Sequence, residues 1–383
     1  MYHAAGSGGL LPDIPMPVPS LLRDREIHYP KTFRMSVPVH HPSPPPRSAV
    51  AVWLLLVCAA IAVMVVLGGV TRLAHAGLSI VEWRPVTGVL PPRSDAQWEE
   101  AFAAYRQFPE YQKLKRGMNL SQFKSIYWLE YLHRLWGRLI GVLFLLPFLW
   151  FLIRRTISGA LAVKLVGMFL LGGAQGVLGW YMVKSGLADR PDVSAYRLTA
   201  HLGLALLLYG YGLWLALGLL GAGTERAGFG RLRTFVAALI SLVGITILSG
   251  GFVAGLDAGF AYNTFPLMGG QLVPEGLWLL EPVYRNFFEN PVTAQFGHRV
   301  LAILTLVLIA VFWFRAGSAP LPARARLACR GLLGAALLQM GLGIATLLLV
   351  VPLPLAAAHQ AGAVLLWTAA LWTAAELGRR SSA

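Results

Sequence analysis

The stretch HRLWGRLIGVLFLLPFLWFLI, residues 133–153, is the clearest sign of how this chain folds. It opens with a histidine and an arginine and continues as an apolar run. Its length is that of a helix crossing the hydrocarbon core of a bilayer, roughly 20 residues. The same pair opens HRVLAILTLVLIAVFWF at residues 298–314, so the pattern occurs twice. Because an imidazole at membrane depth is costly, it usually faces a bundle interior and binds something. The two stretches therefore predict a helical membrane protein with internal binding sites.

The composition of the whole chain points to the same class of protein. Of the 383 residues, 56% are hydrophobic and only 13% are charged, whereas a soluble protein carries about 25% charged residues. Eight windows are long and apolar enough to span a bilayer. We expect the spans near residues 49–70, 133–153, 161–183, 198–220, 233–255, 296–315, 328–350 and 355–375. The predicted fold class is an all-α polytopic membrane protein.

The net charge of +15 is distributed in a way that indicates topology. Arginine and lysine residues gather before the first span, after spans two, four and six, and at the C-terminus. The connection after span five carries four carboxylates and one arginine, and the one after span seven carries no charge. The positive-inside tendency then predicts that both termini are cytoplasmic. Since membrane topology explains the basic residues, no nucleic-acid partner is expected.

An internal repeat divides the chain into two similar halves. Four markers recur in the same order, which chance explains poorly. The matching pairs are Gly68–Gly69 with Gly250–Gly251, His133–Arg134 with His298–Arg299, Gln175 with Gln339, and His201 with His359. Because each half holds an even number of spans, both halves enter the membrane in the same direction, as parallel repeats. The sequence thus predicts two tandem pseudo-symmetric four-helix bundles.

The predicted domain organisation follows from the spans and the repeat. An N-terminal tail, 1–48, is rich in proline, glycine and histidine and is expected to be disordered. The first bundle occupies 49–220 and includes a long outer loop at 72–132. A cytoplasmic linker, 221–232, leads to the second bundle at 233–376 and a short cytoplasmic tail at 377–383. The outer loops at 72–132 and 256–295 are expected to cover apolar ligands as lids, with plain interfacial loops as the alternative.

The four repeat-related histidines are candidate ligands of a metallocofactor. In the predicted topology they lie in the first turns of spans that run from outside to inside, so their imidazoles share one depth. A haem iron takes two axial nitrogens on opposite faces, at about 2 Å each. Two facing imidazoles in each bundle would therefore hold one haem per bundle. A lone histidine at a helix start is more often an interfacial residue, but recurrence at four related positions disfavours that interpretation.

Charged residues beside the histidines are the next candidates. Glu130 precedes His133 by three residues and shares its helix face. A carboxylate there could stabilise positive charge or move a proton, or it could simply favour a helix N-terminus. The second half has Gln295 at this position, so the asymmetry predicts chemistry in the first half and cofactor binding in the second. Arg134 and Arg299 are candidate partners for haem propionates, with snorkelling as the alternative.

Other polar residues near the spans have simpler expected roles. Arg72 is a further propionate candidate. His75 lies in the first loop, opposite Asp257 in the repeat, and is expected to face solvent. Gln175 and Gln339 are expected to bind neighbouring helices, because a polar group inside a span needs a partner there.

Several stretches of the sequence closely resemble the haem A synthase family, which includes the mitochondrial assembly proteins for cytochrome oxidase. They are GGVTRLAHAGLSIVEWRPVTGVLPP at 68–92, FKSIYWLEYLHRLWGRLIG at 123–141, NTFPLMGG at 263–270 and FGHR at 296–299. The histidine-bearing spans four and eight match as well. The likeness covers roughly residues 49–376 and implies eight helices in two bundles.

The resemblance also implies a reaction and its sites. The family oxidises the C8 methyl group of haem O to a formyl group, which gives haem A for cytochrome c oxidase. By carry-over, Glu130, His133 and His201 belong to the substrate haem site, while His298 and His359 ligate a haem b cofactor. The family further suggests contact with a haem O synthase, an electron-transfer partner, surrounding membrane lipid and a homo-oligomer.

The chain departs from some bacterial members of that family because its first outer loop has no cysteine pair. Thiol chemistry described for those members is therefore not carried over. The composition favours a bacterial inner membrane, with the mitochondrial inner membrane as the alternative. Two other functions stay open. A di-haem b-type electron carrier usually needs haems at different depths, and a transporter with inverted repeats is disfavoured by parallel repeats.

Overall fold

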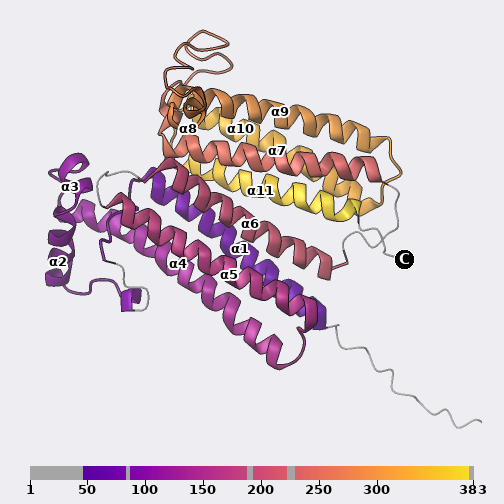
Figure 1. Cartoon of the computed structure of the whole chain (residues 1–383), viewed down its shortest axis with the longest axis horizontal. Helices are drawn as coiled ribbons and strands as arrows, with labels where there is room; N and C mark the ends of the chain where they lie inside the picture. The colour runs from indigo at the N-terminus through magenta and orange to yellow at the C-terminus, as the bar shows by residue number, and fades with distance from the viewer. Residues whose placement is uncertain (1–45, 83–86, 188–192, 222–228, 379–383) are drawn as a thin grey trace, which may run out of the picture. The chain divides into compact units, whose positions relative to one another are not determined.

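The computed structural model describes residues 46–82, 87–187, 193–221 and 229–378 (Figure 1). The predicted N-terminal tail lies almost wholly outside the described residues. Most of the predicted linker, 222–228, and the end of the C-terminal tail, 379–383, lie outside them as well.

Eight of the described helices are long and apolar enough to cross a membrane. They are α1 (Pro46–Leu73), α4 (Leu120–Ile153), α5 (Gly159–Gly186), α6 (Ala195–Leu219), α7 (Gly230–Gly255), α9 (Pro291–Gly317), α10 (Ala323–Leu348) and α11 (Leu353–Leu377). The part of the chain that the structure describes contains no β-strand. The predictions of eight spans and of an all-α fold are confirmed, and the chain is a multi-pass membrane protein.

Short helices occupy the two long connections between spans. The connection after α1 contains η1 (Thr87–Val89), α2 (Asp95–Arg106) and α3 (Pro109–Leu114). The connection after α7 contains η2 (Ala258–Phe260), η3 (Val283–Arg285) and α8 (Asn286–Glu289). We call the end of the spans that carries these two connections the loop end.

The start of α4 differs from the prediction, which placed it at residue 133. The helix begins at Leu120, so His133 is its fourteenth residue. Asn119 caps the N-terminus: its side chain accepts from the Gln122 backbone N–H at 2.9 Å, and the Gln122 side chain accepts from the Asn119 N–H at 3.0 Å. Hydropathy detects only the apolar part of a helix, so these polar first turns were not predicted.

Two further predictions are corrected by the observed boundaries. The four histidines do not lie in the first turns, because α6, α9 and α11 begin at Ala195, Pro291 and Leu353, at least six residues before their histidines. The first loop covers 74–119 instead of 72–132, and α7 begins inside the predicted linker.

The spans pack in two groups that correspond to the repeat. Helix α1 contacts α4 and α6, and α5 contacts α4 and α6. In the second group α9 contacts α7 and α10, and α11 contacts α7 and α10. Figure 1 shows the first group in indigo to magenta and the second in red to yellow. The two groups meet through α1 against α11, α6 against α7, and α6 against α11. This pattern is unchanged when the halves are exchanged, as two parallel repeats require.

Two hydrophobic clusters form the core. The first joins α1, α4, α5 and α6, with Val364 and Leu371 contributed by α11. The second joins α7, α9, α10 and α11. Trp367 of α11 and Ile240 of α7 pack against both clusters. The histidines lie beyond these clusters, towards the loop end, so the core positions the site without filling it.

Candidate functional site

Each of the four predicted histidines lies against a glycine near the end of a neighbouring helix. The imidazole Cε1 comes within 2.8 to 3.1 Å of the place where a Cβ would stand on that glycine. The pairs are His133 on Gly68, His201 on Gly179, His298 on Gly250 and His359 on Gly343. A methyl group on Gly343 would force the ring to move, and on the other three glycines it would press on the ring, so each glycine leaves room for an imidazole. Because the glycines are near the C-terminal ends of α1, α5, α7 and α10, all four imidazoles lie towards the loop end.

The histidine pair of the second half has the spacing of two axial ligands. The ring centroids of His298 and His359 are 6.5 Å apart, with the rings at 89° to each other. Two metal–nitrogen bonds of about 2 Å on opposite sides of an iron leave the ring centroids about 6 Å apart. Ser249 Oγ lies 2.8 Å from His298 Nδ1. Metal-bound imidazoles usually engage their second nitrogen in such a bond, which fixes the ring.

The histidine pair of the first half lies at the equivalent place. His133 is within electrostatic reach of His201. The backbone carbonyl of His201 accepts from Gln175 Nε2 at 3.0 Å, so the expected interhelical role of Gln175 is confirmed. The Nδ1 atoms of His133, His201 and His359 are buried and have no hydrogen-bond partner among the described residues. Buried ring nitrogens normally have a partner, so these three rings differ from that of His298, whose Nδ1 lies beside Ser249.

The donor sets fit a haem better than a bare metal ion. Within the described ranges, no three or more histidine, cysteine, aspartate or glutamate side chains gather as an ion site. A zinc ion takes about four ligands, mostly from protein. A haem carries its own pyrrole nitrogens and requires only axial ligands from the protein. Pairs of imidazoles between helices are therefore suited to haem.

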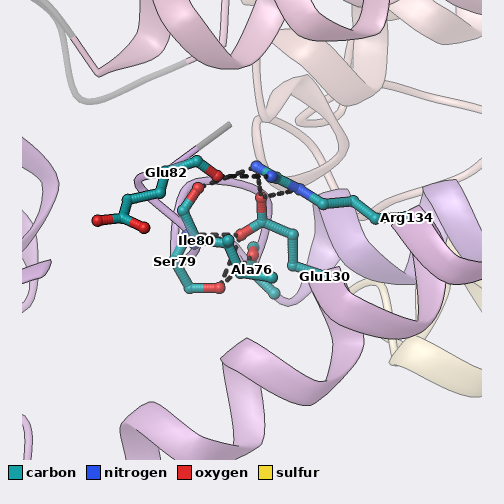
Figure 2. Close-up of polar contacts among 6 residues, drawn as sticks. All are labelled: Ala76, Ser79, Ile80, Glu82, Glu130 and Arg134. Carbon is teal, nitrogen blue, oxygen red and sulfur yellow. Dashed lines mark hydrogen bonds and ion pairs between the residues drawn. The ribbon is translucent and has the colours of Figure 1, made fainter. Parts of the chain in front are cut away.

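Glu130 forms hydrogen bonds with Ser79, Ile80 and Arg134, a group that we call the Glu130 clasp (Figure 2). The residue Glu130 is 2% exposed. One oxygen, Oε2, accepts from Ser79 N–H at 2.7 Å, Ser79 Oγ at 2.7 Å and Ile80 N–H at 2.8 Å. The other, Oε1, accepts from Arg134 Nη2 at 2.6 Å and Nε at 3.1 Å. Glu130 lies well inside α4, so a helix N-terminus does not account for its position. The carboxylate joins the loop after α1 to the helix that carries His133.

The arginine after the first histidine of each half holds a loop. Arg134 donates to the carbonyl oxygens of Ile80 at 2.9 Å and Glu82 at 3.3 Å, and the carboxylate of Glu82 points away from the clasp (Figure 2). Arg299 donates to the carbonyl oxygens of Tyr262 and Thr264, each at 2.8 Å. Both arginines thus bind carbonyls two residues apart in equivalent loops. Their predicted contact with propionates stays a prediction, because these guanidinium groups are engaged by the protein itself.

The two halves differ at the position of Glu130. Gln295 is also buried, but its Nε2 donates to the Tyr262 carbonyl at 3.0 Å, where Glu130 instead accepts from backbone N–H groups. The first half therefore holds a buried carboxylate, paired with Arg134, beside its histidines, and the second half holds a neutral amide. The asymmetry seen in the sequence is present in the site.

Arg72 and Asp257 join the two halves at the loop end. Arg72 Nη2 lies 3.2 Å from Asp257 Oδ2 and donates to the Gly255 carbonyl at 3.3 Å. His75 is exposed, as expected, and both His75 and Asp257 have left-handed backbone conformations, with φ of 47° and 50°. Arg72 therefore connects the halves, and its predicted propionate contact is not shown.

A cavity of about 400 Å³ lies beside the Glu130 clasp, between the first loop and the loop end of α5. Val81, Phe108, Trp180 and Val183 are among its apolar lining residues, and Arg134 also lines it. Sequence reasoning did not find this cavity. It also did not assign roles to the glycines under the histidines, although Gly68–Gly69 and Gly250–Gly251 were visible as repeat markers.

Fold and site define an eight-helix membrane protein in which two parallel repeats each carry a histidine pair suited to haem. A family model described as cytochrome oxidase assembly protein matches residues 51–371. The chain belongs to this family.

Its relatives include bacterial and mitochondrial-type proteins. Heme A synthase of Nitrosospira multiformis is 54% identical over 337 residues, which cover 87% of this chain and 95% of the relative. Heme A synthase of Rhodospirillum centenum is 55% identical over 329 residues, covering 85% and 87%. Heme A synthase COX15 of Bos taurus is 46% identical over 347 residues, covering 88% and 84%.

Proposed function

We propose that this protein is a haem A synthase that oxidises the C8 methyl group of haem O to a formyl group. The overall change takes up one water and releases four protons and four electrons, which pass to an electron-transfer partner. The proposal draws on the relatives' names together with one structural observation: two repeat-related imidazole pairs, one of which has a ring separation of 6.5 Å, close to that of two axial haem ligands.

We assign the substrate and the cofactor to different halves. His133 and His201 bind the iron of haem O, and His298 and His359 bind that of haem b. When bound, haem b supplies reversible one-electron chemistry. The protein positions the rings through the glycines beneath them. The buried charge of Glu130 lies only in the first half, which supports placing the chemistry there.

Glu130 has two tasks in this proposal. Its carboxylate would stabilise positive charge that develops at the reacting carbon before water adds. It also keeps the loop segment Ser79–Ile80 over α4 through the hydrogen bonds described above. Because Arg134 compensates much of its charge, the loop-holding task accounts for more of its contacts.

We further propose that the protein lies in a bacterial inner membrane with both termini in the cytoplasm, so that the loop end faces outward. The mitochondrial inner membrane is the alternative, since relatives of both kinds exist. A haem O synthase as the source of substrate, and a homo-oligomer, are proposed from the family.

Pigment analysis tests the proposed function. The protein is purified from cells that make haem O, and its haems are extracted and separated. We expect haem b together with haem O or haem A, and formation of haem A that depends on the protein. Haem b alone, with no haem A formed, would instead indicate an electron carrier, and absence of haem would leave the proposal without support.

A further inference from the structure

The cavity beside the Glu130 clasp contains a second cation that the clasp does not use. Lys184 lies at the loop end of α5, is exposed, and lines the cavity with Arg134. Its Nζ lies 5.0 Å from the centroid of the Trp180 ring. Arg134 donates to Glu130 and to two loop carbonyls, whereas among the described residues the ammonium group of Lys184 contacts only the Trp180 ring.

Two residues that line the cavity, Arg134 on α4 and Trp180 on α5, are adjacent in sequence to residues of the first histidine site. Trp180 follows Gly179, which lies against the His201 ring, and Arg134 follows His133. Lys184 is five residues beyond Gly179, a rise of about 7.5 Å along the helix. Since α5 runs towards the loop end, Lys184 stands on the loop side of the level at which the imidazoles face each other. The edge of a flat ligand held between the imidazoles can therefore point into this cavity.

The lysine occurs in one half only. Gly343 corresponds to Gly179 in the repeat, so the counterpart of Lys184 is Leu348. The first half carries Glu130 where the second half has Gln295. It thus also carries the additional cation, Lys184. The cavity is mostly apolar and is lined by two cationic residues, Arg134 and Lys184, and one carboxylate residue, Glu82. The excess of positive charge suits a ligand edge that ends in a carboxylate.

We propose that the cavity receives the propionate edge of the substrate haem, and that Lys184 binds a propionate and so helps to select this ligand. The inference rests on the proposed function, because haem O must be the ligand of His133 and His201. Lys184, and not Arg134, is then the propionate partner in this half, because the donors of Arg134 hold the loop.

The test combines a protein variant with a ligand variant. Purified protein that retains its haem b is titrated with haem O and with the dimethyl ester of haem O, which lacks both carboxylates, and binding is followed by absorbance. The wild-type protein should prefer the free acid, and Lys184→Leu should reduce that preference by about fivefold, as for a partly exposed ion pair. Lys184→Arg should retain it. Lys164→Leu, which removes the other lysine of α5 near its opposite end, should leave it unchanged.

An unchanged preference in Lys184→Leu would overturn the inference, and so would an equal loss in Lys164→Leu. The haem b spectrum of each variant reports whether the protein has folded, and in the wild type rising salt should weaken binding of the free acid but not of the ester. Haem A formation is measured in parallel. If haem A forms while Lys184→Leu keeps its preference, only this inference fails. If Lys184 selects the free acid but no haem A forms, the proposed function fails instead.

Discussion

At the scale of single residues, the site depends on glycines as much as on histidines. Each imidazole occupies space that a side chain on the neighbouring helix would take, and the closest approach is that of His359 to Gly343, 2.8 Å from a Cβ position. An axial ligand must be held within a few tenths of an ångström of its productive place. Glycines that press on the rings thus contribute to their position.

Gly343→Ala tests this contact. The added methyl group forces the His359 ring to move, and such overpacking costs about 1–3 kcal/mol, so we expect roughly tenfold weaker haem retention. Gly341→Ala lies two residues away on α10, where a Cβ meets nothing within 4 Å. It is the matched control and should retain haem fully. Haem per protein and the reduced-minus-oxidised spectrum measure the effect, and equal retention in both variants would contradict it.

Glu130→Gln separates the charge of the clasp from its shape. The amide keeps the size of the side chain but removes the ion pair with Arg134, in which the Glu130 side chain is 3% exposed and the Arg134 side chain 13%. Removing one partner of a buried pair costs about 3 kcal/mol or more. We expect a lower thermal unfolding midpoint and reduced haem A formation. Glu100→Gln, at an exposed site on α2, should change neither. Full activity in Glu130→Gln would exclude a role for the charge.

At the scale of elements, the first loop has a small core of its own. Trp98 and Phe102 of α2 pack with Tyr105 against Phe123 at the start of α4. Glu110 of α3 is buried; its carboxylate accepts from Tyr105 Oη at 3.1 Å and lies 3.2 Å from Lys115 Nζ. Lys115 Nζ in turn donates to the His75 carbonyl. The loop is therefore packed onto α4 and tied to the end of α1.

The Glu110 contact makes the loop sensitive to pH. Burial raises the pKa of Glu110 above its ordinary value of 4.5, and the ion pair with Lys115 offsets part of that rise. Between the ordinary and the raised pKa, the folded loop binds more protons than the unfolded one, so its stability falls as pH rises through that range. Hydrogen exchange of α2 and α3, corrected for its intrinsic pH dependence, should show faster opening across this range. Glu110→Gln should flatten the dependence, and an equal slope in both proteins would contradict it.

The sequence predicted the elements better than their polar ends. Hydropathy placed all eight spans, and the repeat placed the histidine pairs in equivalent positions. The first turns of α4 were missed because Ser121, Gln122 and Lys124 are polar, although Asn119 and Gln122 form a capping box. The loop-binding role of Arg134 and Arg299 was not predicted, because it depends on carbonyl groups that every residue carries. No sequence pattern marks those.

At the scale of the whole molecule, the glycine pairs join the two sites. Gly68 lies against His133 of its own half, and Gly69 lies against Gln360, which follows His359 in the other half. Gln360 Nε2 donates to the Val65 carbonyl of α1 at 2.8 Å. In the repeat, Gly250 lies against His298 while Gly251 lies against Thr199 and Leu202 of α6. Each glycine pair thus touches a histidine on one side and the opposite half on the other.

Gly69→Ala should disturb this junction. Its Cβ would overlap the Gln360 side-chain amide, 1.4 Å from Oε1, so the amide must move and lose its bond to α1. Losing a partly buried hydrogen bond costs about 1 kcal/mol, and we expect a lower thermal unfolding midpoint. Gln360→Ala removes the overlapping group. Its effect on the unfolding midpoint should therefore be smaller in the Gly69→Ala protein than in the wild-type protein. Additive losses in the double variant would show that the two residues do not interact.

The most direct test of paired imidazoles as haem ligands is the haem b spectrum of purified His298→Ala and His359→Ala proteins, with His133→Ala as the comparison. We predict that each of the first two variants loses bound haem b or its two-histidine absorption spectrum, while His133→Ala retains both. Unchanged haem b in His298→Ala and His359→Ala would contradict the assignment of this pair, and with it the proposed division of the molecule into a substrate half and a cofactor half.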